Sequence, residues 1–317
     1  MPSVDVIHDF DPWGDPLCTC PQKYSFDPYT GCAHRCLYCY ITSYIPRAFE
    51  CRPKKNLLKR LKRDLRKIDK RRVISMSNSS DPYPPVEAEL KLTRSCIELF
   101  EGEGCRLLVI TKSDLVARDA DLLAKMGAAV SMTITTLSEE TSKRLEPGAP
   151  SPRRRLAALR RLADQGVPVA LRLDPVIPSV NDADIEETVE AAANAGVAHI
   201  TSSTYKLRPD SWHRIREGFP ETAARLAHLY FERGERRRNS WYLPLELRRE
   251  LMERVKAACD ERGLTFASCR EGLAELTSAA SCDGSHLVRT ASGPAHLKDI
   301  DCLPTSTCAL RSKSSSE

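Results

Sequence analysis

The chain has 317 residues, of which 41% are hydrophobic and 29% are charged. This is the profile of a globular protein, and no run approaches the roughly 18 consecutive apolar residues that a membrane-spanning helix needs. Residues 1–11 are acidic and mixed, so they do not read as a signal peptide, and we expect a cytoplasmic protein without a membrane partner.

Short β-branched runs alternate with amphipathic stretches along the first two thirds of the chain. The predicted strands are residues 23–29, 72–76, 106–111, 129–135, 167–173 and 198–203. The predicted helices are residues 56–70, 86–100, 115–126, 151–165 and 185–194. This alternation indicates an α/β fold with a parallel sheet and right-handed crossovers. Six such units over about 180 residues suit a partial (β/α)6 TIM-like barrel better than a complete barrel of eight units.

The alternation stops after Tyr205. Residues 221–234 and 244–263 have the pattern of charged helices, and the chain after Ser268 is small, polar and contains cysteines. We therefore expect four parts: an N-terminal extension (1–21), the partial barrel (22–205), a helical, cysteine-containing C-terminal extension (206–310) and a disordered tail (311–317).

Thirteen cysteines are many for a chain of this length, and five of them lie between Cys18 and Cys39. In a reducing compartment thiols stay free, so a disulfide framework is not expected. Clustered free thiols in such a compartment are typical of metal binding.

The densest group is GCAHRCLYCY at residues 31–40, in which Cys32, Cys36 and Cys39 have the spacing Cys-x3-Cys-x2-Cys. Three thiolates from one loop can bind three irons of a cubane cluster and leave the fourth iron open to a small chelating molecule. A structural zinc site is the alternative, but it normally needs a fourth ligand. His34 lies between two cysteines, where a side chain rarely reaches the same metal.

At these residues the sequence resembles the radical S-adenosylmethionine (SAM) superfamily, in which the same cysteine spacing follows the first strand of a partial barrel and an aromatic residue precedes the third cysteine. Tyr38 stands at that aromatic position. The resemblance covers residues 20–205 and implies a [4Fe-4S] cluster on Cys32, Cys36 and Cys39. It further implies SAM at the open iron, Tyr38 on the adenine side, and an electron donor such as ferredoxin or flavodoxin. The implied reaction is reductive cleavage of SAM to a 5′-deoxyadenosyl radical that abstracts hydrogen from a substrate.

A closer resemblance is to the spore photoproduct lyase-like branch. It rests on YCYI at 38–41, SNSSDPYPP at 77–85 and ITKS at 110–113, with TIT at 133–135 as a weaker match. Each motif is expected at the carboxyl end of a strand, where barrel enzymes place their sites. The resemblance implies that SAM is bound by Ser80, Asp81, Lys112 and Thr133, with Lys112 paired to the SAM carboxylate.

Two residues of this branch concern the fate of the radical. Spore photoproduct lyases have a hydrogen-donating cysteine where this chain has Asn78, and an amide does not readily donate a hydrogen atom. Tyr40, which the resemblance places near the radical, is present. We therefore expect the cofactor chemistry of this branch but a different substrate. Cys96 and Cys105 are expected to lie too far from the site to replace the missing thiol.

Arg172 and Asp174 end the fifth predicted strand and should face the same site. Asp174 could hydrogen-bond a ribose hydroxyl, or the two residues could form a structural ion pair.

The stretch Arg52–Arg72 contains twelve Lys or Arg against two Asp. Such a cluster suits a nucleic acid backbone, although a leucine stripe in it is also consistent with the solvated face of a helix. A nucleic acid or nucleotide derivative is accordingly the predicted substrate, with a peptide or small metabolite as the alternative. The non-enzymatic alternative is a zinc-stabilised nucleic-acid-binding module.

The role of the remaining cysteines can be interpreted in more than one way. Cys18 and Cys20 suit either a second metal site or inert packing thiols. The loop-rich C-terminal segment offers a second metal site at Cys269, Cys282, Cys302 and Cys308, and one of these thiols could also replace the missing hydrogen donor.

Overall fold

The structure is a computed structural model of the chain and describes residues 4–11 and 14–289. Its main sheet has eight strands in the order β1-β2-β5-β6-β7-β8-β9-β12. Their bounds are Ile7–Asp9, Tyr24–Phe26, Val73–Met76, Arg106–Thr111, Ala129–Thr133, Val169–Val176, His199–Thr204 and Thr265–Ser268. Within this sheet, β2, β5, β6, β7, β8, β9 and β12 run parallel, and β1 pairs antiparallel with β2 at one edge.

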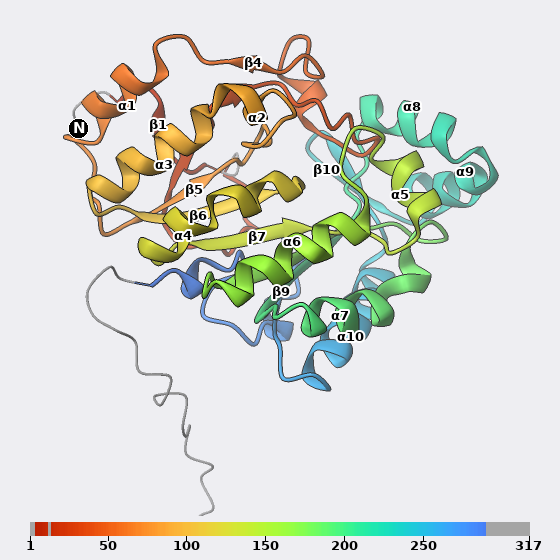
Figure 1. Cartoon of the computed structure of the whole chain (residues 1–317). Coiled ribbons are helices and arrows are strands. Elements are labelled where there is room, and N and C mark those ends of the chain that lie inside the picture. The colour runs from red at the N-terminus through yellow and green to blue at the C-terminus, as the bar shows by residue number, and fades with distance from the viewer. Residues whose placement is uncertain (1–3, 12–13, 290–317) are drawn as a thin grey trace, which may run out of the picture.

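The helices that connect consecutive strands lie on one face of this sheet, as α3, α6 and α7 show in Figure 1. The α-helices within the described residues are α1 Leu57–Asp64, α2 Glu87–Leu90, α3 Leu92–Gly102, α4 Ala120–Lys125, α5 Glu139–Leu145, α6 Pro152–Asp164, α7 Ile185–Asn194, α8 Pro209–Gly218, α9 Pro220–Ala227 and α10 Leu245–Asp260. Two small antiparallel pairs, β3 (Tyr29–Thr30) with β4 (Arg52–Pro53) and β10 (Glu235–Arg237) with β11 (Ser240–Tyr242), lie outside the sheet.

The predicted class, an α/β partial barrel, is confirmed, and all six predicted strands are present. The sheet is wider than predicted because β1 and β12 extend its two edges. The short strand β12 follows the charged helix α10 and pairs parallel with β9. The C-terminal extension therefore adds one strand to the barrel wall. The predicted tail at 311–317 and residues 290–310 of the extension lie outside the described residues.

The predicted basic helix 56–70 is shorter in the structure. α1 ends at Asp64, and the chain then turns before β5. The buried Asp64 carboxylate accepts hydrogen bonds from the amides of Asp5, Val6 and Ile7, which ties α1 to the edge strand β1. Among the described residues no helix has the length and apolarity needed to cross a bilayer.

Candidate active site

A cavity of about 560 Å³ lies at the carboxyl ends of the parallel strands, a volume within the usual range for small-molecule sites. It is lined by all the residues that the sequence predicted for the site: Cys32, Cys36, Tyr38, Cys39, Tyr40, Asn78, Ser80, Asp81, Lys112, Thr133, Arg172 and Asp174. They meet there because the carboxyl ends of parallel strands lie at one edge of a sheet.

The cysteine loop, residues 31–40, follows β3 and bends sharply at Gly31. Gly31 has a φ of +79°, and a Cβ atom there would lie 2.2 Å from the carbonyl oxygen of Glu50. The amide of Cys32 donates to the carbonyl of Ala48 at 2.7 Å, and that of Cys39 donates to the carbonyl of Cys36 at 3.2 Å. Glycine is therefore required for the loop to lie against residues 48–50 and to turn its thiols toward the cavity.

The three loop thiols share one electrostatic environment. Burial raises the pKa of Cys32 to about 12 and also raises the pKa of Cys36 and of Cys39, and the charge of Cys39 raises the pKa of Cys32 and Cys36 further. The positive charge of Lys112 lowers the pKa of Cys36 and of Cys39 and so partly offsets this effect. A polynuclear metal cluster would supply the positive charge that these thiolates need, so the donor set fits an iron–sulfur cluster.

A chain segment that sequence reasoning did not identify supports the loop from one side. The Leu37 amide donates to the Leu145 carbonyl at 2.9 Å, and the Gly148 amide donates to the His34 carbonyl at 2.9 Å. Tyr38 donates its hydroxyl to the buried Glu146 carboxylate. The cysteine loop is thus clamped against the connection between α5 and α6, and α5 itself was not predicted.

Helix α8 supports the loop from the other side. Arg214 donates from Nε to the Leu37 carbonyl at 3.0 Å and from Nη2 to the Cys39 carbonyl at 2.7 Å. α8 lies in the extension after Tyr205, and the sequence gave no local signal for this contact.

The Asp81 carboxylate joins three parts of the site. Its Oδ1 accepts from the Thr111 hydroxyl at 2.7 Å, its Oδ2 accepts from the Lys112 amide at 2.7 Å, and His34 Nε2 lies 3.2 Å from the same Oδ2. Burial opposes ionisation of Asp81, but His34 and the backbone donors outweigh it and lower the pKa of Asp81 to about 2. Asp81 therefore links β6 and the cysteine loop as a charged group.

Two serine hydroxyls on the cavity wall are buried and lack a partner among the described residues. Within the described part of the chain, the Oγ atoms of Ser77 and Ser80 have none, and both residues line the cavity together with Thr133. A buried polar atom without a partner costs free energy, so these hydroxyls are suited to contact a polar ligand.

Tyr40 and Asn78 are in direct contact, since the Tyr40 hydroxyl donates to the Asn78 carbonyl. The Asn78 side chain donates to Ser25 Oγ at 2.8 Å and accepts from Ser75 Oγ at 3.2 Å. Cys96 and Cys105 are buried in the hydrophobic core and are not among the residues that line the cavity.

Arg172 and Asp174 form an ion pair, with 2.6 Å between Nη2 and Oδ2. This is one of the two interpretations that the sequence left open for these residues. Asp174 Oδ1 also accepts from Ser203 at 2.6 Å.

Asp27 is a site residue that sequence reasoning missed. It lines the cavity, accepts from the amides of Ser79 and Ser80 at 3.3 Å, and has its pKa raised by burial.

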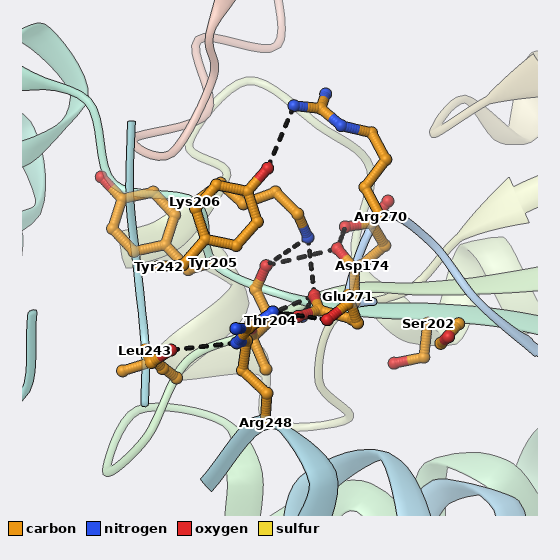
Figure 2. A network of polar contacts seen from close by, with 12 residues as sticks. Asp174, Ser202, Thr204, Tyr205, Lys206, Tyr242, Leu243, Arg248, Arg270 and Glu271 are labelled. Carbon is orange, nitrogen blue, oxygen red and sulfur yellow. Dashed lines mark hydrogen bonds and ion pairs between the residues drawn. The ribbon is translucent and has the colours of Figure 1, made fainter. Parts of the chain in front are cut away.

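Beyond Asp174, the buried Glu271 supports the cavity wall. Figure 2 shows it between Thr204, Lys206 and Arg248. Glu271 accepts from the Thr204 amide at 2.7 Å and from Lys206 Nζ at 2.6 Å. The guanidinium of Arg248 donates to the Glu271 carbonyl and to the Leu243 carbonyl. This network fixes the chain after β12 against the carboxyl end of β9.

The sequence profile described as the radical SAM superfamily matches residues 26–192, more than half of the chain. The chain therefore belongs to the radical SAM superfamily, whose members bind an iron–sulfur cluster and SAM.

Its similarity to individual proteins extends beyond that span. The protein MJ0683 of Methanocaldococcus jannaschii is 33% identical over 63% of this chain and 78% of its own length. The protein Rv2578c of Mycobacterium tuberculosis is 27% identical over 74% of this chain and 73% of its own. A radical SAM Nα-GlyT isomerase of Pseudomonas phage M6 is 24% identical over 77% of this chain and 53% of its own.

Solved structures share the fold. A spore photoproduct lyase variant superposes with a TM-score of 0.64 at 19% identity and covers 84% of this chain and 80% of its own. Another variant, with bound SAM and a dinucleoside spore photoproduct, has a TM-score of 0.61 at 18% identity and covers 77% and 75%. Streptococcus suis SuiB bound to precursor peptide SuiA has a TM-score of 0.53 at 15% identity and covers 77% and 48%.

Proposed function

We propose that the protein is a radical SAM enzyme in which Cys32, Cys36 and Cys39 hold a [4Fe-4S] cluster and the adjoining cavity holds SAM. The single observation that carries this proposal is the convergence of three loop thiols, a lysine and unpartnered hydroxyls on one cavity. The bound cluster would supply the electron that cleaves SAM to methionine and a 5′-deoxyadenosyl radical, which takes hydrogen from the substrate.

The chain's own residues would bind SAM and orient it. Lys112 is surrounded by Cys36, Glu146 and Asp81, which raise its pKa against the effect of burial and keep it cationic. An ammonium in this position suits the SAM carboxylate. The hydroxyls of Ser80 and Thr133 would contact the methionine part, and Tyr38 would lie on the adenine side. The Asp81 carboxylate already accepts from the Thr111 hydroxyl and the Lys112 amide and lies against His34. These contacts favour a positioning role for Asp81.

For the substrate we propose a nucleic acid or a nucleotide derivative. Support comes from the spore photoproduct lyase structure that holds a dinucleoside photoproduct. The Arg52–Arg72 segment supports it less than its composition suggested, because much of its charge is paired: Arg60 and Arg63 with Asp5, Lys70 with Glu103, Arg71 with Asp69 and Arg72 with Asp9. A peptide is the alternative, favoured by the peptide-bound SuiB structure.

The lyase reaction itself is not part of the proposal. Asn78 stands at the position of the hydrogen-donating cysteine, and its amide is hydrogen-bonded to Ser25 and Ser75. We infer that this chain shares the cofactor chemistry and treats the substrate radical differently. Ferredoxin or flavodoxin is the proposed source of the electron.

Anaerobic purification followed by iron, sulfide and zinc analysis tests the class of site. The protein should contain at least about four irons with matching sulfide per chain, and SAM with dithionite should yield 5′-deoxyadenosine. Zinc without iron, together with intact SAM, would contradict the proposal and favour the zinc-stabilised binding module.

Replacing Lys112 by Ala tests the proposed carboxylate contact. A hydrogen bond to a charged group contributes about 1.5–3 kcal/mol, so the apparent affinity for SAM should fall by about 10- to 160-fold while the iron content is kept. Equilibrium binding of SAM to the anaerobic protein measures this. Lys125 at the end of α4 is exposed and paired with Glu101 on α3, and it gives the matched control Lys125→Ala. Unchanged SAM affinity in Lys112→Ala would remove Lys112 from the SAM site.

A further inference from the structure

Four cysteines outside the cysteine loop also line the cavity, although they come from opposite ends of the chain. They are Cys18, Cys20, Cys269 and Cys282, called the four-cysteine group below. Cys20 Sγ lies 3.2 Å from Cys282 Sγ, and Cys18 lies two residues before Cys20 in the sequence. Cys269 lies close enough to interact electrostatically with the other three. The two segments that carry these thiols are more than 240 residues apart in the sequence.

Cationic side chains border the four-cysteine group. Lys23 Nζ lies 3.8 Å from Cys20 Sγ and forms a buried ion pair with Asp283. Arg172 lines the same cavity as Cys269 and is a second cation of this wall. Thiolates gathered in one place need such charge, whereas neutral packing thiols do not. Cys96, Cys105 and Cys259 show the contrast, since each is buried in the hydrophobic core away from the cavity.

The C-terminal segment that carries Cys269 and Cys282 is held in place before any ligand is considered. The Cys269 amide donates to the Ser202 carbonyl at 2.8 Å, and the neighbouring Glu271 is fixed by Thr204, Lys206 and Arg248 (Figure 2). The Cys282 carbonyl accepts from the Thr201 hydroxyl at 2.8 Å. Preorganisation of this kind is what a ligand site requires of its supporting residues.

Two simpler explanations fit less well. The eleven cysteines in the described ranges are all free, so the Cys20–Cys282 contact is not a disulfide. In the same ranges no three Cys, His, Asp or Glu side chains surround a point that would suit a single ion. The four thiols instead line one cavity, the setting in which thiolates from separate segments can hold a polynuclear cluster.

We propose that Cys18, Cys20, Cys269 and Cys282 bind a second iron–sulfur cluster with a complete set of four thiolate ligands. This cluster has no open iron and therefore does not chelate SAM. Its ligand set differs from the one expected from the sequence, since Cys18 and Cys20 accompany Cys269 and Cys282. Cys302 and Cys308 lie outside the described residues and are not needed for four ligands.

The test uses the full chain with Cys32, Cys36 and Cys39 replaced by Ala, purified without oxygen. This variant should retain about two or about four irons with equal sulfide, the content of a [2Fe-2S] or [4Fe-4S] cluster. Adding Cys20→Ala and Cys282→Ala in that background should remove the remaining iron. The matched control is Cys105→Ala in the same background, which should retain it. Circular dichroism establishes that each variant is folded.

A folded triple variant without iron and sulfide would overturn the proposal. So would zinc in place of iron, or a Cys20–Cys282 disulfide found in the anaerobic protein. If the triple variant does not fold, electron paramagnetic resonance of the reduced wild type decides: two cluster signals, of which SAM perturbs only one, are expected, and a single signal overturns the proposal. Failure of the proposed function is separate, because it is read from 5′-deoxyadenosine formation by the wild type.

Discussion

Alanine at Cys32, Cys36 and Cys39 together is expected to abolish 5′-deoxyadenosine formation. A methyl side chain cannot bind iron, and the structure places no other cysteine among the described residues of the loop that could replace these three. The loss of about four irons per chain should accompany the loss of activity. Iron analysis and the product assay on one anaerobic preparation measure both effects.

The matched control for this prediction is Cys51→Ala. Cys51 is half-buried, directly follows the segment on which the loop rests, and is not among the cavity-lining residues. It should leave iron content and SAM cleavage close to those of the wild type. Product formation by the triple alanine variant would contradict the assignment of the loop cysteines, whatever the outcome for the four-cysteine group.

Arg155→Met is expected to destabilise the fold by about 3–5 kcal/mol, the usual cost of leaving one charge of a buried pair without its partner. Arg155 and Glu146 are both almost fully buried, with 2.5 Å between Nη1 and Oε2. Arg155 also donates to the Thr133 carbonyl at 3.0 Å and to the Pro150 carbonyl at 2.7 Å. Methionine fills similar space but offers none of these donors.

Denaturant unfolding measured for three variants checks this prediction. Arg153→Met changes an exposed arginine in the first turn of the same helix, α6, and should cost no more than about 0.5 kcal/mol. Adding Glu146→Gln to Arg155→Met should recover part of the loss, because it removes the uncompensated charge. Equal stability of Arg155→Met and Arg153→Met would show that the buried pair does not stabilise the fold. Since Glu146 also accepts from Tyr38, iron binding by the loop should weaken in Arg155→Met.

The sequence alone determined the parallel barrel and, through its resemblance to the spore photoproduct lyase-like branch, the motif residues that converge on the cavity. Both follow from local patterns: strand and helix periodicities differ, and the motif residues follow predicted strands directly. Once these strands are parallel, their carboxyl ends must lie at one edge, so Cys32, Asp81, Lys112 and Thr133 were placed together without knowledge of any long-range contact.

Only the tertiary structure decided what surrounds those residues. Three contacts join segments that are far apart in the chain. They are those of Arg214 of α8 with the cysteine loop, of Glu146 with Tyr38, and of Asp5 with Arg60. The seventh parallel strand, β12, is four residues long and has no distinctive pattern of its own. The convergence of Cys20 with Cys282 depends on how the two ends of the chain close the barrel, because periodicity records which face a residue presents and not which distant residue it meets.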